Sequence, residues 1–274
     1  MTIDVDISGL ALRFEGLSQE LGEELERQWP AYVREGRGTP SLTLAVEDDD
    51  RVMRPGRFME GTLRMEATPA SVVVRRDEGE LVQEVRGARA VVRLAQGDPG
   101  RRFWGLVNLA CAAVAWRLQQ SGGGVVHAAG IVMNDRAFLL VGPSGCGKTT
   151  WARAAAEAGV PVLSDDCVLV ESAAGRLTAL GSPFRSKEHP SPGPGRWPVA
   201  ALLIPRWDEA PSLAPANRLM LEARIAANLL YSTPAWDAHT AAAGSAAAIA
   251  AGAPAYVLSY RPDASWLGVL GTIV

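Results

Sequence analysis

The sequence has few cysteines, which argues against one class of protein, and few lysines, which makes each lysine informative. Its 274 residues contain three cysteines, Cys111, Cys146 and Cys167. An odd number without metal-type spacing argues against a disulfide scaffold and for a reducing compartment, so we expect a cytoplasmic protein. The lysines are Lys148 and Lys187, and arginine supplies the other basic charges. These two lysines therefore need a specific explanation.

The sequence also lacks a large charge imbalance and a long hydrophobic run. The formal net charge of −3 gives no electrostatic reason to expect a nucleic-acid or membrane-surface partner. The first residues are acidic where a signal peptide needs basic residues and an apolar run. The most apolar stretch, residues 106–118, is too short to span a bilayer. A hydrophobic content of 48% instead provides for one large core or two smaller ones.

Residues 1–100 are dominated by short alternating segments separated by turns, which predict a β-rich, α+β region. We expect an antiparallel sheet made of the segments IDVDI, LTLAV, TLRMEA, SVVVRR, LVQEV and AVVRLA. A helix is expected at residues 18–29, with Ser18 as its N-cap. Substrate or partner binding is the role we consider for this region.

Residues 101–124 predict a buried connecting helix closed by a Ser-Gly-Gly-Gly stretch. Residues 125–274 predict an α/β domain. We expect strands at VVHAAGIVM, AFLLVG, CVLVE, RLTAL, VAALLIPR and AYVLSY, a helix at residues 217–231, and an alanine-rich helix or pair of helices at residues 234–251. The segments CVLVE and RLTAL should form a hairpin.

The stretch GPSGCGKT, residues 142–149, matches the pattern GxxxxGK[ST] between a predicted strand and a predicted helix. Its glycines let backbone N–H groups turn toward phosphates, and the helix N-terminus adds positive potential. Lys148 would reach the β- and γ-phosphates, and the Thr149 hydroxyl would join a magnesium shell. The pattern predicts ATP and Mg²⁺ as cofactors, with GTP or pyrophosphate as alternative donors. The predicted nucleotide-binding residues are Gly142, Pro143, Ser144, Gly145, Cys146, Gly147, Lys148, Thr149 and Thr150.

Two adjacent carboxylates follow a short apolar strand soon after the glycine-rich stretch. Asp165 and Asp166 leave that strand in opposite directions, so one can join the magnesium shell while the other accepts a proton from an attacking hydroxyl. A kinase needs this division of roles. The alternative is an Asp-Asp turn capped by its own backbone. His127, on a strand, is on general grounds more often a core residue than a catalytic one.

Together these elements resemble HPr kinase/phosphorylase, a bacterial serine kinase whose P-loop catalytic domain is related to phosphoenolpyruvate carboxykinase. The family pattern is a histidine strand, a strand into GxSGxGKS, a short helix ending in glycine, and a strand ending in Asp-Asp. Here it reads His127, residues 142–149, Gly159 and VLSDDCV, within residues 127–171. The resemblance implies that Asp165 is the general base, that Asp166 supports magnesium and that His127 tunes the base, although the two aspartates could be reversed. It also favours a homo-oligomer.

The chain departs from the family in two places. The Glu-x-Arg-Gly-like second signature has no counterpart in residues 181–188, and the first 100 residues do not resemble the usual N-terminal domain. The chain therefore resembles a divergent HPr-kinase-like protein, a group that includes tailoring kinases for ribosomal peptides. Arg185 and Lys187 could form a cationic arm that closes over the γ-phosphate, or they could be solvated surface charges.

These observations predict an ATP- and Mg²⁺-dependent kinase that phosphorylates a hydroxyl, with a serine of a small protein or peptide as the favoured acceptor. A small-metabolite kinase on the same core is one alternative. A nucleotide-binding regulatory or assembly module without transfer activity is the other. Whether Asp165 is needed only for turnover separates the module from a kinase, because a kinase without that carboxylate should still bind nucleotide.

Overall fold

The computed structural model describes residues 1–34, 38–49, 64–68, 70–184, 189–231 and 236–273, without the side chains of residues 236–242. The chain divides into two compact units. The N-terminal unit comprises Met1–Val114 and Thr233–His239, and the C-terminal unit comprises Ala115–Ser232 and Thr240–Val274. Helix α2 (Pro99–Gln119) contains the boundary between the first segments of the two units. The fold class is mixed α/β, as the sequence predicts.

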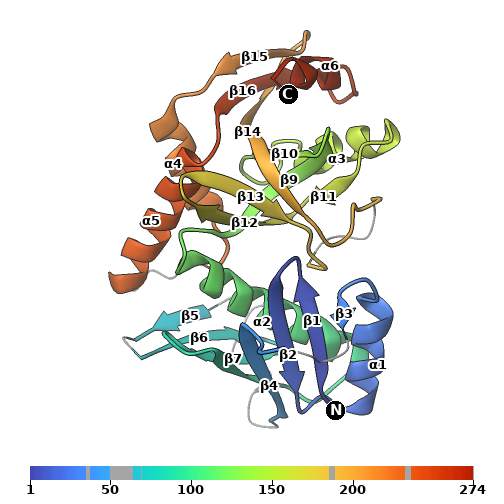
Figure 1. The fold of residues 1–274 in the computed structure, drawn as a ribbon, viewed down its shortest axis with the longest axis vertical. Helices are drawn as coiled ribbons and strands as arrows, with labels where there is room; N and C mark the ends of the chain where they lie inside the picture. Colours follow the sequence, from blue (N-terminus) through green and yellow to red (C-terminus); the bar gives the residue numbers. More distant parts are fainter. Residues whose placement is uncertain (35–37, 50–63, 69, 185–188, 232–235, 274) are drawn as a thin grey trace. The chain divides into compact units, whose positions relative to one another are not determined.

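The described strands of the N-terminal unit form one sheet in the order β3-β1-β2-β4-β8-β7-β6-β5 (Figure 1). Their bounds are β1 (Ile3–Ile7), β2 (Leu10–Glu15), β3 (Val33–Arg34), β4 (Leu42–Asp48), β5 (Arg64–Ala67), β6 (Ser71–Arg76), β7 (Gly79–Glu84) and β8 (Arg89–Leu94). The expectation of an antiparallel sheet is wrong at its centre, where β4 pairs parallel to both β2 and β8. Long connections separate these strands in sequence, and strands joined by long crossovers can pair in parallel whereas hairpins cannot. Strand β2 was not predicted.

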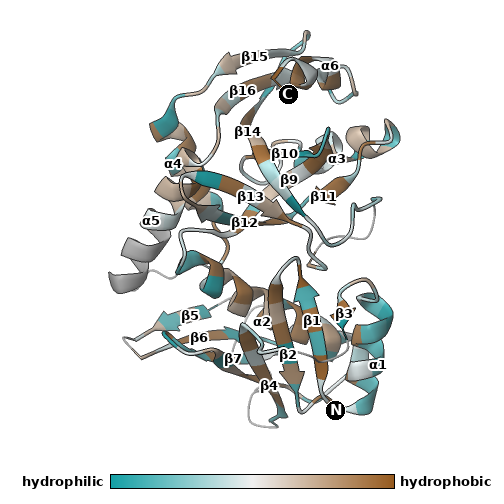
Figure 2. Cartoon of the chain, viewed as in Figure 1, coloured by the Kyte–Doolittle hydropathy of each residue, from teal (hydrophilic) through white to brown (hydrophobic). Residues whose placement is uncertain are grey.

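Alternation of side chains explains why these segments form half-buried strands. In β1 the residues Ile3, Val5 and Ile7 are buried while the aspartates between them are partly exposed. Figure 2 shows the same alternation as brown and teal segments along the N-terminal strands. Helix α1 (Gln19–Gln28) begins where predicted, because the Ser18 hydroxyl accepts a hydrogen bond from the Leu21 N–H at 3.3 Å.

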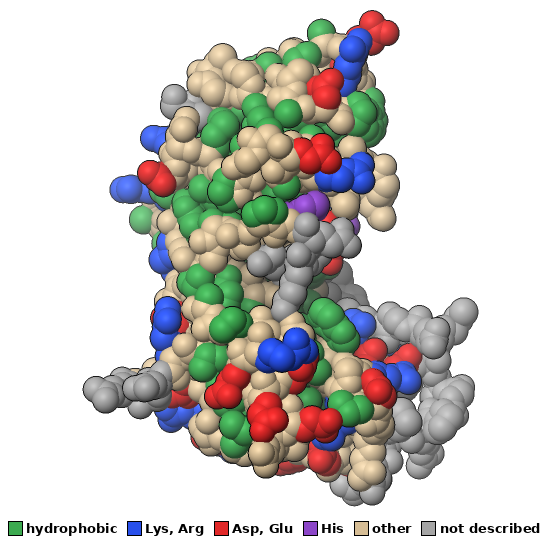
Figure 3. All heavy atoms as spheres, turned by 90° about the vertical axis from the view of Figure 1, so that its right-hand side faces the viewer, with side chains coloured by type: hydrophobic (Ala, Val, Ile, Leu, Met, Phe, Trp, Pro, Cys, Tyr) green, Lys and Arg blue, Asp and Glu red, His purple; other side chains and the backbone are tan. Residues whose placement is uncertain are grey.

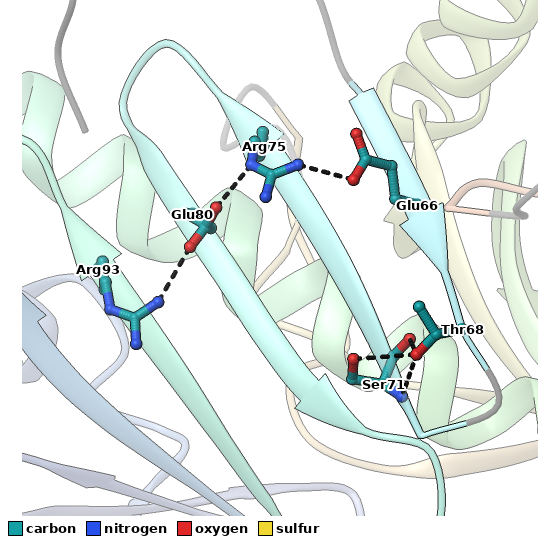
Figure 4. A network of polar contacts seen from close by, with 6 residues as sticks. All are labelled: Glu66, Thr68, Ser71, Arg75, Glu80 and Arg93. Carbon is teal, nitrogen blue, oxygen red and sulfur yellow. Dashed lines mark hydrogen bonds and ion pairs between the residues drawn. The ribbon is translucent and has the colours of Figure 1, made fainter. Parts of the chain in front are cut away.

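The opposite face of this sheet carries a ladder of ion pairs across β5, β6, β7 and β8 (Figure 4). Arg75 contacts Glu66 at 3.0 Å and Glu80 at 2.6 Å, and Glu80 in turn accepts from Arg93 at 3.0 Å. The side chains in these pairs are between 18% and 66% exposed, and ion pairs open to solvent contribute about 0–1 kcal/mol each. Figure 3 views the chain from the right-hand side of Figure 1, and there too the basic and acidic side chains of the described residues are interspersed.

The C-terminal unit contains a second sheet in the order β10-β9-β12-β13-β14-β16-β15, with β11 paired to β9. The strands are β9 (Gly124–Met133), β10 (Arg136–Val141), β11 (Val162–Ser164), β12 (Cys167–Ala173), β13 (Arg176–Leu180), β14 (Arg196–Trp207), β15 (Ser212–Pro215) and β16 (Ala255–Tyr260). Since β10 also pairs with β14, the strands β10, β9, β12, β13 and β14 close into a ring. The predicted hairpin of β12 and β13 is confirmed.

Helices cover both faces of this second sheet. They are α3 (Lys148–Glu157), α4 (Arg218–Asn228), α5 (Trp236–Ala251) and α6 (Trp266–Leu270), followed by the 3₁₀ turn η1 (Gly271–Ile273). Helix α4 begins after Asn217, whose side chain accepts from the Met220 N–H at 3.1 Å. The alanine-rich segment forms one helix, α5, whereas α6 and β15 were not predicted. Within the described ranges no helix combines the length and apolarity needed to cross a bilayer.

Two hydrophobic cores lie on the two faces of the sheet and hold β10 and β14 between them. Leu139 and Leu202 belong to the core beneath α4 and α5, while Leu140 and Leu203 belong to the core beneath α3 and α6. In the second core the ring of Trp151 on α3 stacks on Trp266 on α6, with centroids 4.8 Å apart. This stacking fixes α3, and with it the loop that precedes α3.

Replacement of Trp151 by alanine should therefore destabilise the C-terminal unit strongly. The Trp151 ring is fully buried, so we expect a loss of about 3–5 kcal/mol in the free energy of unfolding. Leu219→Ala is the matched control, because Leu219 is 75% exposed on α4 of the same unit and its loss should change stability by less than about 0.5 kcal/mol. Denaturant unfolding followed by circular dichroism measures both. Equal losses in the two variants would contradict this packing.

Candidate functional site

The glycine-rich loop, residues 142–147, connects β10 to α3. Strand β10 is buried between β9, to which it pairs antiparallel, and β14, to which it pairs parallel. Two residues of the loop have backbone angles that favour glycine: Gly145 at φ +80° and Gly147, the N-cap of α3, at φ +99°. A side chain on Gly147 would also lie 2.8 Å from the Tyr260 hydroxyl. The helix therefore begins without a side-chain cap, and its first N–H groups are directed at the loop.

Lys148, the first residue of α3, turns its ammonium back over this loop. The side chain is buried, with 6% of the residue exposed. Its Nζ donates to the carbonyl oxygens of Gly142 at 2.8 Å and Pro143 at 3.1 Å. Burial lowers the pKa of Lys148, and the neighbouring Cys146 and Asp166 oppose that shift. An ammonium has three donors, so one is left for an anion above the loop.

The two aspartates lie where β11 ends and β12 begins, both along β9. Ser164 pairs with Gly130 and Cys167 pairs with His127, so the aspartates lie opposite two alanines of β9. The hydroxyl of Ser164 accepts from the N–H groups of Asp166 at 3.1 Å and Cys167 at 3.0 Å. This serine turn holds the bend that presents both carboxylates.

His127 contacts Asp166. Its Nδ1 lies 2.9 Å from Asp166 Oδ1 and 3.0 Å from the Asp166 carbonyl oxygen. Both partners can only accept, so Nδ1 carries the proton and donates to them. This hydrogen bond is the main cause that lowers the pKa of Asp166, and the charge of Lys148 adds to it. The Asp166 side chain is 67% exposed, so the pair lies at the surface of the site.

Asp165 differs from its neighbour in burial and in partners. Only 8% of the residue is exposed, and its Oδ1 is buried without a hydrogen-bond partner in the described part of the chain. A buried carboxylate oxygen without a partner is destabilising, so the site favours a cation or a donor group against Asp165.

One cavity of about 540 Å³ brings these groups together. The described residues that line it are His127, Ser144, Gly145, Gly147, Lys148, Thr149, Thr150, Asp165 and Asp166. The volume lies within the range of roughly 300–1,000 Å³ that small-molecule sites occupy. The structure thus gathers residues that are separated in sequence into one hollow.

The remaining predicted site residues are not among the described residues that line this cavity. Gly142 and Pro143 are not among the lining residues, and they contribute carbonyls that hold Lys148. Cys146 packs against Gly142, where an added Cβ would lie 2.7 Å from the Cys146 sulfur. Arg185 and Lys187 lie outside the described residues.

The oxygen atoms of the side chains that line the cavity fit the ligand preference of a magnesium ion. Mg²⁺ prefers oxygen ligands and is commonly held by one or two carboxylates together with substrate phosphates. Thr149, Asp165 and Asp166 line the cavity and carry such oxygens. Within those residues no group of three or more His, Cys, Asp and Glu side chains could hold a metal alone. A metal here would therefore depend on oxygens from a bound ligand.

Sequence reasoning missed three residues beside the site. Ser164 carries a local signal, because a serine two residues before a bend is a common turn residue. Trp207 and Tyr260 end β14 and β16, and their rings stack with centroids 5.2 Å apart. Only the strand order brings these rings to Gly147, so no local pattern could identify them.

The comparisons with known proteins give little. No protein-family model matches the chain, and no curated protein matches it. Among solved structures, the HPr(Ser) kinase/phosphatase from Coxiella burnetii is similar over 54% of this chain and 94% of that chain, with 14% identity and a TM-score of 0.31. A superposition this loose does not bear on activity, so the functional argument depends on the site itself.

His127→Ala should raise the pKa of Asp166 toward its ordinary value of 3.8, because the variant removes the hydrogen bond that favours the carboxylate. The folded-state pKa is depressed, so the stability contributed by this group is present above the unfolded value and is lost as pH falls through the folded value. Carbon-13 NMR titration of the carboxyl carbon measures the shift.

Asp4 of the N-terminal unit is the internal control for this titration. A hydrogen bond from Arg13 lowers its pKa, and that pKa should not change in the variant. An unchanged pKa at Asp166 would contradict the contact between His127 and Asp166.

Proposed function

We propose that this protein is an ATP- and Mg²⁺-dependent kinase that transfers the γ-phosphoryl group to a hydroxyl, with a serine of a small protein or peptide as the favoured acceptor. One observation carries the proposal: a single cavity is lined both by the glycine-rich loop with Lys148 and by the group of His127, Asp165 and Asp166. Phosphoryl transfer needs a cradle for the phosphates and a proton acceptor within reach of it. The lining of this cavity contains both.

The phosphates would lie over the glycine-rich loop. The uncapped N-terminus of α3 offers backbone N–H groups, and Gly145 and Gly147 allow the loop backbone to turn toward a ligand. The Lys148 ammonium is already held above the loop by two carbonyls, so its charge is positioned before a nucleotide binds. Burial of that ammonium favours an anionic ligand, which would replace the water that it has lost.

The burial of the two aspartates supports an assignment of roles opposite to the one that the family resemblance implies. Asp165, which is mostly buried and lines the same cavity as Thr149, fits the magnesium shell. Mg²⁺ bound there would neutralise negative charge on the phosphates. Asp166, exposed and oriented by His127, fits the proton acceptor that faces an arriving substrate.

In the reaction the acceptor oxygen bonds to the γ-phosphorus, the bond from that phosphorus to the leaving ADP oxygen breaks, and the hydroxyl proton passes to the Asp166 carboxylate. His127 keeps that carboxylate oriented through its Nδ1–H. The hydrogen bond from His127 and the charge of Lys148 lower the pKa of Asp166, so its carboxylate is ionised and able to accept the proton.

The proposal assigns transfer to residues 125–274, joined through the connecting segment 101–124, which contains most of α2 (Pro99–Gln119), to the β-rich residues 1–100, which would recognise the acceptor or a partner. We place the protein in the cytoplasm, with a homo-oligomer as the favoured state and neither nucleic acid nor membrane as partner.

Arg185 and Lys187 are proposed to form a cationic arm over the γ-phosphate. A small metabolite in place of the peptide would leave the transfer chemistry unchanged.

The test is labelling of a lysate from the protein's own source with γ-labelled ATP and Mg²⁺, using Asp166→Asn and Asp165→Asn as matched variants. Asp166→Asn should bind Mg-ATP normally by calorimetry but transfer about 10²–10⁴-fold more slowly, because it lacks the proton acceptor. Asp165→Asn should need more Mg²⁺ for half-maximal transfer. Lys148→Ala should lose nucleotide binding.

The other outcomes of the labelling test distinguish the alternative functions and the alternative roles of the two aspartates. Slow transfer with normal magnesium dependence in Asp165→Asn, together with a normal rate in Asp166→Asn, would restore the family order of the two roles. A labelled small molecule would identify a metabolite kinase. ATP binding without transfer to any component would refute the kinase and favour a nucleotide-dependent regulatory module.

A further inference from the structure

The glycine-rich loop has chemically different neighbours on its two sides. Strand β9 pairs with one edge of β10 and carries the contacts to Asp165 and Asp166 through β11 and β12. Strand β14 pairs parallel with the other edge of β10, and β16 pairs parallel with β14. Because parallel strands end at the same edge of a sheet, the ends of β14 and β16 lie beside the loop, where ligands of α/β sheets commonly bind.

Those two strand ends carry a stacked aromatic pair. The rings of Trp207 and Tyr260 are 5.2 Å apart with 26° between their planes. Tyr260 is fully buried, and its hydroxyl donates to the Gly147 carbonyl at 3.5 Å. An added Cβ on Gly147 would lie 2.9 Å from Trp207 Cζ2, so the edge of the indole packs against the loop.

Trp207 is nevertheless 52% exposed. The stacked Tyr260 ring covers one face of the indole, and the remaining indole surface contributes to this exposure. Tyr260 is itself held in the core beneath α3, which makes the indole a supported, flat apolar surface next to a polar cavity. Such a surface suits a planar ligand.

We propose that Trp207 is the platform on which the purine base of the nucleotide stacks. The inference rests on the proposed function. If the γ-phosphate lies toward Asp165 and Asp166, the chain of phosphates crosses the loop, and the nucleoside end emerges toward β14 and Trp207. Stacking uses the flat face of a base rather than its hydrogen-bonding edge, so this platform accepts adenine and guanine alike.

The test compares ligands with and without a base. Calorimetry in the presence of Mg²⁺ measures the binding of ATP, GTP and inorganic tripolyphosphate to the intact chain and to Trp207→Ala, Trp207→Phe and Trp104→Ala. Both nucleotides should bind the intact chain more tightly than tripolyphosphate. Trp207→Ala should weaken ATP and GTP by roughly tenfold, as the loss of base stacking on an aromatic ring does, and leave tripolyphosphate unchanged.

The other two variants keep the test specific. Trp207→Phe should restore most of the nucleotide affinity, because phenylalanine also offers a flat ring. Trp104, 58% exposed in the N-terminal unit, is the control, and its replacement should change none of the three affinities.

Three results would overturn the inference. Unchanged ATP affinity in Trp207→Ala, with intact tripolyphosphate binding, would refute the platform alone. An equal loss of ATP and tripolyphosphate would also refute it, since Trp207 would then act by supporting the loop. If the intact chain bound neither ATP nor tripolyphosphate, the proposed function would fail and the inference with it.

Discussion

The pairing of β10 along both of its edges is the constraint on which the site depends. One edge joins β9 in an antiparallel ladder and the other joins β14 in a parallel one, while the two cores bury both faces of the strand. The glycine-rich loop therefore starts from a rigid point. At the other end of the loop, helix α3 is fixed by the stacked rings of Trp151 and Trp266. A loop anchored in this way can keep its N–H groups and Lys148 in position for a ligand, as a preorganised site requires.

Charges in the cavity are arranged so that a magnesium–phosphate ligand would satisfy them. Lys148 is a buried cation held by carbonyl oxygens, and Asp165 is a buried anion with an oxygen that has no partner among the described residues. Asp166, by contrast, is exposed and already paired with His127. The difference in burial, more than the order in the chain, separates the roles of the two aspartates. Buried groups carry a desolvation cost that a bound ligand can offset, and exposed groups do not.

Local sequence signals predicted the parts of the fold that depend on neighbouring residues. The cap at Ser18, the hairpin of β12 and β13, and the strand–loop–helix order around Lys148 all follow from such signals. The parallel pairing of β4 and the position of Trp207 beside the loop depend on contacts between distant segments, which periodicity does not encode. The family resemblance connected His127 with the base, but the partner that the structure gives it, Asp166, depends on the register of β12 along β9.

We expect the glycine-rich loop and the acidic pair to bind the same nucleotide. Paramagnetic broadening of the His127 imidazole resonance by Mn²⁺-ATP tests this, with Mg²⁺-ATP as the diamagnetic reference and His127→Ala to assign the signal. The His127 resonance should broaden selectively, because the metal would lie beside Asp165 and within the cavity that His127 lines. A nucleotide that binds through Lys148 and leaves the His127 signal sharp would show that the loop and the acidic pair do not share it.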